Sequence, residues 1–180
     1  IIKSCTRQVT VLNSEIVKSR LPLLHTALQF VGHLQTRNRG TFGGSVAHSD
    51  PAAEIPLAAL ALDSEVELRN VNGSRRVAMA DYVVGPLMTA REPDELLVAV
   101  HLPAIVPNVT TVTSFCEVSE RHGDFAVVAA RAHAAAVGAA QLGGAHALVR
   151  GEIPYSHGHV AAHVELEAFR LAGDRRRHRE

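Results

Sequence analysis

Two adjacent glycines, Gly43 and Gly44, lie within a segment, residues 37–45, that also carries two arginines and two hydroxyl side chains. Because glycine has no Cβ atom, its backbone amide can approach a phosphate closely and can adopt positive φ angles. Thr41 and Ser45 add hydroxyl donors, and the arginines add positive charge. These residue types in this order are typical of an anion-binding turn.

The spacing of the glycines excludes the two commonest nucleotide motifs. It is neither GxGxxG followed by an acidic residue nor GxxxxGK[ST], so it predicts neither a Rossmann fold nor a P-loop. A helix predicted at residues 51–62, capped by Asp50, would bring its positive end close to the turn. The same spacing also fits a surface turn in which Arg37 and Arg39 are solvated. The residues alone leave both interpretations open.

A longer stretch, residues 36–56, closely resembles the second flavin-binding segment of the medium subunits of molybdenum hydroxylases. This family includes the xanthine and carbon monoxide dehydrogenases. Residues 30–33, 85–89, 94–97 and 121–126 resemble further family segments, so the resemblance covers residues 1–136. It implies that the glycine turn wraps the FAD pyrophosphate and that later residues reach the sugar, the ribityl chain and the flavin ring. The FAD contacts implied by position are Arg39, Gly40, Thr41, Phe42, Gly43, Gly44, Ser45, His48, Asp50, Glu54, Leu97 and Asp124.

The resemblance also implies a role in electron transfer. In the family, a molybdopterin cofactor in a large subunit oxidises the substrate, and 2Fe-2S clusters in a small subunit pass electrons to FAD. The flavin then reduces NAD, a quinone or oxygen. The chain is thus expected to be the FAD-binding component of an oxidoreductase with these two partner subunits. No side chain of this chain is expected to act catalytically on the organic substrate.

The periodicity of apolar residues predicts a mixed α+β domain, with helices first and a mostly antiparallel sheet after them. Thr6 is expected to cap a short helix, and Asn72-Gly73 to form the turn of a hairpin. The resemblance implies the PCMH-type, vanillyl-alcohol-oxidase-like fold of flavoproteins. Helices are predicted at residues 21–34 and 51–62, a loop at 35–49, strands at 65–69, 75–79, 96–102 and 111–119, and either a strand or a helix at 125–136.

Composition excludes several classes of partner. Lys plus Arg equals Asp plus Glu at 18 each, so no net charge favours nucleic acid. No apolar run is long enough for membrane insertion. Cys5 and Cys116 fit no metal-ligand spacing, and two reduced, mostly buried thiols are expected in a cytoplasmic protein. The histidines of segment 157–163 have an HxHxxxH spacing but lack a completing ligand, so we expect no metal site there.

Two domains are predicted: residues 1–136 as a partial FAD-binding domain and residues 137–180 as an atypical tail. The family's first flavin loop lies upstream of the segment that corresponds to Ile1, and its C-terminal domain does not resemble the tail. The chain is therefore expected to be incomplete at both ends and to bind FAD weakly by itself. The alternatives are a truncated, non-catalytic remnant that acts as an interaction module, and a generic nucleotide-binding α+β domain.

Overall fold

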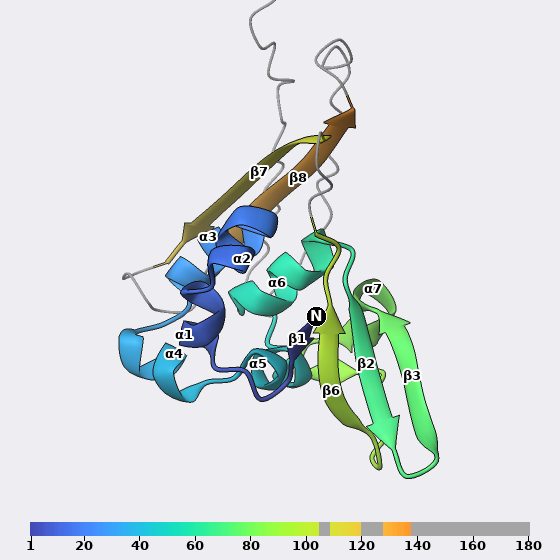
Figure 1. The fold of residues 1–180 in the computed structure, drawn as a ribbon. Helices are drawn as coiled ribbons and strands as arrows, with labels where there is room; N and C mark the ends of the chain where they lie inside the picture. Colours follow the sequence, from blue (N-terminus) through green and yellow to red (C-terminus); the bar gives the residue numbers. More distant parts are fainter. Residues whose placement is uncertain (105–108, 120–127, 138–180) are drawn as a thin grey trace, which may run out of the picture.

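A computed structural model describes residues 1–104, 109–119 and 128–137 of the chain. The first part is mainly helical, and most strands follow it (Figure 1). The helices are α1 Gln8–Leu12, α2 Glu15–Arg20, α3 Pro22–Phe30, α4 Leu34–Arg39, α5 Phe42–His48, α6 Glu54–Ala61 and α7 Met79–Tyr82. The strands are β1 Ile2–Lys3, β2 Glu65–Asn70, β3 Gly73–Ala78, β4 Val83–Gly85, β5 Met88–Thr89, β6 Leu96–His101, β7 Val109–Val118 and β8 Val128–Val137.

The main sheet has four antiparallel strands in the order β1-β6-β2-β3. Its hairpin β2–β3 turns where Asn70 pairs with Gly73, whose φ of 151° suits glycine. The side chain of Asn70 accepts a hydrogen bond from the Asn72 amide at 2.9 Å, which closes the turn. Strand β1, at the start of the chain, pairs with β6, with Ile2 opposite Val100. The sheet therefore joins residues that are distant in sequence.

Two smaller hairpins extend the fold. Strands β4 and β5 form one of them, directly after α7. Strands β7 and β8 form the other, which is longer and lies beside α3 (Figure 1). The ring centroids of Phe30 at the end of α3 and Phe115 on β7 are 5.2 Å apart. This aromatic contact attaches the β7–β8 hairpin to the helical layer.

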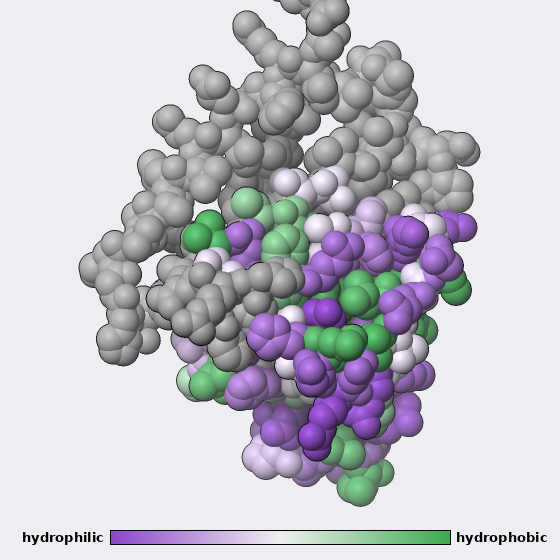
Figure 2. All heavy atoms as spheres, turned by 90° about the vertical axis from the view of Figure 1, so that its left-hand side faces the viewer, coloured by the Kyte–Doolittle hydropathy of each residue, from purple (hydrophilic) through white to green (hydrophobic). Residues whose placement is uncertain are grey.

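One hydrophobic core joins the helices to the sheet. Helices α1 to α6 lie to the left of the main sheet in Figure 1, whereas α7 lies beside β2 and β3, and buried residues from the helices and the sheet form a single cluster. Leu24, Leu28 and Ile55 come from the helices, whereas Val66 and Val100 come from the sheet. The outer face beside α1 and α4 is mostly hydrophilic where the described residues form it, and polar groups separate its apolar patches (Figure 2). The apolar residues are thus mainly inside.

Several local expectations were wrong. The stretch at residues 35–49 was predicted as a loop, but it contains α4 and α5. Thr6 does not cap α1, whose N-cap is Arg7 without a side-chain hydrogen bond. Asp50 caps the turn before α6 and not the helix itself: its Oδ1 accepts from the Ala52 amide at 2.8 Å, and the N-cap of α6 is Ala53. Of the tail predicted at residues 137–180, Val137 is the last residue of β8, and residues 138–180 lie outside the described residues.

The larger elements were predicted correctly. The hairpin of β2 and β3, helix α3, helix α6 and strands β6 and β7 all occur at the predicted positions, with bounds shifted by a few residues. The sequence pattern left residues 125–136 open between strand and helix, and the structure has strand β8 there. Helices come first and an antiparallel sheet follows, as the α+β prediction requires.

Candidate functional site

The glycine turn forms the start of helix α5. Thr41 is the N-cap, with extended backbone, and its Oγ1 accepts a hydrogen bond from the Gly44 amide at 3.1 Å. The two preceding amides are already engaged, because Phe42 N donates to Thr6 O at 2.8 Å and Gly43 N to Ser4 O at 3.0 Å. Of these three amides, only that of Gly44 is bonded to a side chain and not to backbone, so it is the one that a phosphate could bind if the Thr41 hydroxyl gave up its hydrogen bond.

The two glycines serve different purposes. Gly43 is buried, and a Cβ atom there would lie 2.4 Å from the Cβ of Ser4. Gly44 is exposed, and a Cβ atom there would lie 2.7 Å from Oγ1 and 4.0 Å from Cβ of Thr41, without a close contact to another segment of the chain. Gly43 thus allows α5 to pack against the start of the chain. Gly44 leaves the solvent side of the turn open, as a bound anion requires.

The chain segment of residues 4–8 runs beside the turn and holds it. Arg7 and Thr41 form an isolated antiparallel β-bridge, and Gln8 N donates to Gly40 O at 3.0 Å. Gln8 is buried, and its side-chain amide lies 3.5 Å from Thr41 O. A Cβ atom on Gly40 would lie 2.9 Å from the side chain of Gln8. Tertiary hydrogen bonds thus fix a turn that its own sequence would leave flexible.

The predicted ring-side residue Leu97 lies on β6, close to the same segment. Ser4 Oγ donates to the carbonyl oxygen of Leu97 at 2.5 Å, and Ser4 N donates to Val98 O at 3.1 Å. Ser4 therefore contacts both β6 and α5. No sequence signal indicated Ser4, because an isolated serine near a strand end has no motif of its own.

The residues that follow the glycine turn differ in how far they are exposed to solvent. Ser45 is half-buried and His48 is exposed, both on α5. Ser49 ends the helix with a φ of 52°, in the left-handed region, and is 3% exposed. Asp50 follows in the next turn and is half-buried. The fold thus brings Thr41, Gly44, Ser45, His48 and Asp50 into one short stretch of surface, from α5 to the turn after it.

Glu54 is a buried acidic side chain. It is the first residue of α6 and is 7% exposed. The pKa of Glu54 is raised from 4.5 to about 7, mainly by burial, with smaller raising contributions from the negative charges of Glu117 and Asp50 and an opposing hydrogen bond from its own backbone amide. Near neutral pH this carboxyl group can therefore either donate or accept a hydrogen bond.

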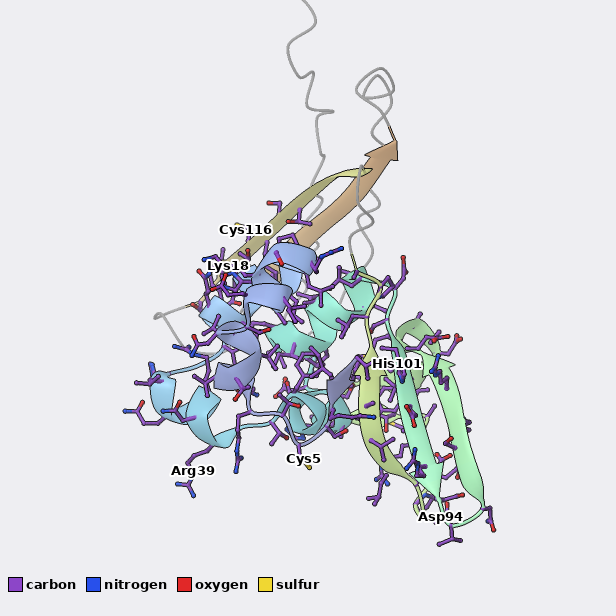
Figure 3. All side chains as sticks on the ribbon, viewed as in Figure 1. Cys5, Lys18, Arg39, Asp94, His101 and Cys116 are labelled. Carbon is purple, nitrogen blue, oxygen red and sulfur yellow. The ribbon has the colours of Figure 1, made fainter. Side chains whose placement is uncertain are left out.

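The basic residues of the motif do not surround the turn. Arg37 is half-buried, and its Nη1 donates to Val31 O at 2.7 Å and Gly32 O at 2.8 Å. Its role in the fold is thus to close the loop between α3 and α4. The side chain of Arg39 extends away from α5 (Figure 3). Arg7, which sequence reasoning did not single out, donates from Nη1 to Arg39 O beside the turn.

The remaining predictions concern residues outside this cluster. Asp124 and the histidines of segment 157–163 lie outside the described residues. Among the residues that the structure describes, no group of three or more His, Cys, Asp or Glu could hold a metal ion. Within the same part of the chain, every helix is too short or too polar to cross a bilayer. Cys5 and Cys116 are free thiols, but the expectation that they are mostly buried was wrong, because both are exposed.

Comparison with known proteins identifies the family. Residues 1–105 match the family model described as FAD binding domain in molybdopterin dehydrogenase. The chain is 37% identical over 126 residues to the 6-hydroxypseudooxynicotine dehydrogenase complex subunit alpha of Paenarthrobacter nicotinovorans, which covers 70% of the chain and 42% of that relative. It is 32% identical over 126 residues to the carbon monoxide dehydrogenase medium chain of Hydrogenophaga pseudoflava, covering 70% of the chain and 43% of the relative.

Solved structures agree with this result. The structure of carbon monoxide dehydrogenase from Hydrogenophaga pseudoflava superimposes with a TM-score of 0.66 at 32% identity, over 72% of this chain and 44% of that one. Quinoline 2-oxidoreductase from Pseudomonas putida 86 gives a TM-score of 0.66 at 32% identity, over 71% and 44%. The chain spans less than half the length of these relatives. It belongs to the family of FAD-binding domains of molybdopterin dehydrogenases.

Proposed function

We propose that residues 1–136 form part of the FAD site of a molybdenum hydroxylase and that this site transfers electrons. The observation that carries the proposal is the position of Thr41 and Gly44 at an open helix start, joined through Ser4 to Leu97 on β6. FAD is a long cofactor that needs contacts at its phosphates and at its ring. The two proposed contact regions are connected through hydrogen bonds to Ser4, which accepts from Gly43 N and donates to Leu97 O.

The residues present are compatible with FAD. At the turn, the open side of Gly44 gives room for a phosphate, and the hydroxyls of Thr41 and Ser45 supply hydrogen bonds. The resemblance assigns Arg39, Gly40 and Phe42 to the same region. Phe42 is fully buried and Arg39 points away from α5 (Figure 3), so we assign them supporting roles and not direct contacts.

The sugar and ribityl hydroxyls require partners that both donate and accept hydrogen bonds. His48 and Asp50 lie at the C-terminal side of α5, and Glu54 lies at the start of the next helix. A carboxyl group with a pKa of about 7 is present in both protonation states at neutral pH, so Glu54 can serve either function. We assign these three residues to the middle of the cofactor, Leu97 to the ring, and Asp124 to the ring on the resemblance alone.

Bound FAD would supply the redox chemistry, accepting electrons and passing them to an acceptor. In this proposal the chain's own residues bind and orient FAD. None of the described residues is assigned as an acid or a base that acts on an organic substrate. We place the iron–sulfur small subunit and the molybdenum large subunit of the complex as its partners. We place the complex in the cytoplasm, because Cys5 and Cys116 remain exposed thiols and the described residues contain no disulfide.

An FAD titration followed by quenching of flavin fluorescence tests the proposal. It compares this chain with a version extended upstream to include the family's first glycine loop. We expect saturable binding by the extended form, weakened by Gly44→Ala and unchanged by Ser74→Ala, which alters an exposed residue of β3. If a folded extended form binds no FAD, the proposal is wrong. Binding of ATP or NAD without FAD would identify a generic nucleotide-binding domain instead.

A further inference from the structure

Ser4 lies at the junction between the main sheet and the glycine turn. Strand β1 pairs with β6 through Ile2 and Lys3, and Ser4 N continues this ladder by donating to Val98 O at 3.1 Å. The chain then turns, with Thr6 N donating to Lys3 O at 3.0 Å. After this turn, residues 6–8 run beside residues 40–42 at the start of α5 and no longer pair with β6. Ser4 is thus the residue at which the chain leaves one element and joins the other.

Ser4 forms three hydrogen bonds to other elements. Its amide donates to Val98 O at 3.1 Å, its carbonyl oxygen accepts from Gly43 N at 3.0 Å, and its hydroxyl donates to Leu97 O at 2.5 Å. The backbone bonds depend only on the path of the chain, whereas the bond to Leu97 depends on the serine side chain. Ser4 is half-buried, so this hydrogen bond is partly protected from competition by water.

Gly43 allows α5 to approach Ser4 closely. A Cβ atom on Gly43 would lie 2.5 Å from Cα and 2.4 Å from Cβ of Ser4, so only glycine permits this approach. Helix α5 is therefore pressed directly against Ser4, and any movement of Ser4 relative to β6 moves the turn. The Ser4 hydroxyl resists that movement by attaching its residue to the strand.

We propose that Ser4 is a positioning residue of the flavin site. Its hydroxyl fixes the distance between the phosphate-binding turn at Thr41–Gly44 and the ring-side strand at Leu97. The inference rests on the proposed function, because that distance matters only to a ligand that contacts both places. FAD spans both regions, whereas ADP contacts the phosphate side alone. Ser4 thus acts on cofactor binding through Gly43 and Leu97 and touches no reacting atom.

The first measurement needs no flavin. Ser4→Ala is compared with Ser19→Ala in the full chain and in the upstream-extended form. Ser19 is an exposed residue of α2 whose hydroxyl donates to the backbone carbonyl of Glu15 at 2.7 Å, so its variant loses the same kind of hydrogen bond elsewhere. We expect hydrogen exchange at the amides of Gly43 and Gly44 to become about five- to tenfold faster in Ser4→Ala only. Unchanged exchange at these amides would overturn the proposal.

The second measurement compares two ligands in the upstream-extended form. For Ser4→Ala we expect the dissociation constant of FAD to rise about five- to tenfold and that of ADP, measured by competition, to rise less than twofold. Equal losses for both ligands would show a general weakening of the turn and would overturn the positioning role. If the unaltered form binds no FAD while exchange still increases in Ser4→Ala, the proposed function fails, whereas the structural connection through Ser4 stands.

Discussion

The backbone amide of Leu87 donates a hydrogen bond to the carbonyl oxygen of Ser49 at 3.1 Å, and both residues have left-handed backbones, with φ of 57° and 52°. Leu87 lies in the turn between β4 and β5, and Ser49 is the C-cap of α5. The hydrogen bond thus joins the tip of a hairpin to the end of the helix that begins at the glycine turn. Both ends of α5 are fixed by residues distant in sequence.

Leu87→Gly is expected to stabilise the fold. A leucine at positive φ is strained, and its side chain is 59% exposed, so little apolar burial is lost on its removal. We expect the free energy of unfolding, measured by urea denaturation, to rise by about 0.5–1 kcal/mol. The control is Leu96→Gly on β6, which is 71% exposed and has no positive φ, and should destabilise. A lower stability for Leu87→Gly would show that its side chain makes a contact worth more than the strain.

Gly43→Ala and Gly44→Ala should differ in their effect on the free energy of unfolding. The added methyl group at Gly43 meets the backbone of Ser4, and we expect a loss of about 1–3 kcal/mol in the free energy of unfolding. At Gly44 it meets only the rotatable hydroxyl of Thr41, so we expect less than about 1 kcal/mol of change, since alanine also favours the helix.

Binding distinguishes the same pair of glycine variants. In the upstream-extended form, Gly44→Ala should weaken FAD binding although the fold is intact, because the methyl group occupies the open side of the turn. Circular dichroism and the flavin titration are to be measured on the same samples. A Gly44→Ala variant with the affinity of the unaltered form would place the phosphates elsewhere.

Thr41→Ala should remove the N-cap of α5. The hydroxyl of Thr41 is the acceptor for Gly44 N, and loss of such a cap costs about 1 kcal/mol. Thr41→Ser retains the hydroxyl and should keep most of the stability and the FAD affinity. Thermal unfolding and the flavin titration measure the two effects. Equal losses in Thr41→Ser and Thr41→Ala would show that the methyl group of Thr41, and not its hydroxyl, is what matters.

Glu54 should make the fold less stable as the pH rises. Its folded-state pKa of about 7 exceeds the usual 4.5, so the folded state binds the proton more tightly than the unfolded state. Stability from this group is therefore present below pH 4.5 and is lost as the pH rises to about 7. The shift corresponds to about 3 kcal/mol at most.

Glu54→Gln isolates this contribution. The variant stays uncharged, so we expect its free energy of unfolding to exceed that of the unaltered chain above pH 7 and to be flatter between pH 4.5 and 7. Glu117→Gln removes one like charge and should move the transition to lower pH. Parallel pH profiles for Glu54→Gln and the unaltered chain would contradict the raised pKa.

Glu95 should have the opposite dependence on pH. It is 6% exposed, and Arg75 donates to both of its oxygens, from Nε at 2.6 Å and from Nη2 at 2.8 Å. This pair, with a hydrogen bond from the Glu92 amide, lowers the pKa of Glu95 to about 2. Stability from Glu95 is therefore present above pH 4.5 and is lost as the pH falls toward 2.

Glu95→Gln should lose the stability that the ionised carboxylate contributes, and it should therefore be less stable than the unaltered chain at neutral pH. Arg75→Lys keeps the charge but not the two-pronged geometry, so we expect an intermediate effect. Guanidinium denaturation at several pH values measures these differences. If the unaltered chain and Glu95→Gln lose stability equally between pH 4.5 and 2, other carboxylates govern the acid response.

The sequence predicted elements whose signals are local. Alternation at residues 65–69 and the Asn72-Gly73 pair were sufficient for the β2–β3 hairpin, and helical spacing was sufficient for α3. Helix α5 was missed because its two glycines disfavour a helix locally. Hydrogen bonds from the segment of residues 4–8 hold it in place, and that segment is distant in sequence.

For the candidate site too, the sequence predicted which segments take part but not how they pack. The resemblance located the segment from Thr41 to Glu54 and the strand with Leu97, but their FAD contacts stay predictions. The sequence could not show that Gly43 packs on Ser4, that Arg39 points outward, or that Glu54 is buried. Each of these features depends on how separate elements pack against one another, and the periodicity and spacing of residues carry no information on that packing.

The pairing of β1 with β6 has a consequence for biosynthesis. Ser4 and Leu97 are 93 positions apart, so the glycine turn leaves the ribosome well before the strand that completes its surroundings. Until β6 has emerged and docked, β1 lacks the strand with which it pairs, and long-range pairings of this kind form late. Cofactor loading would then follow translation of this region, and a chain released early would expose an unfinished turn to proteases and chaperones.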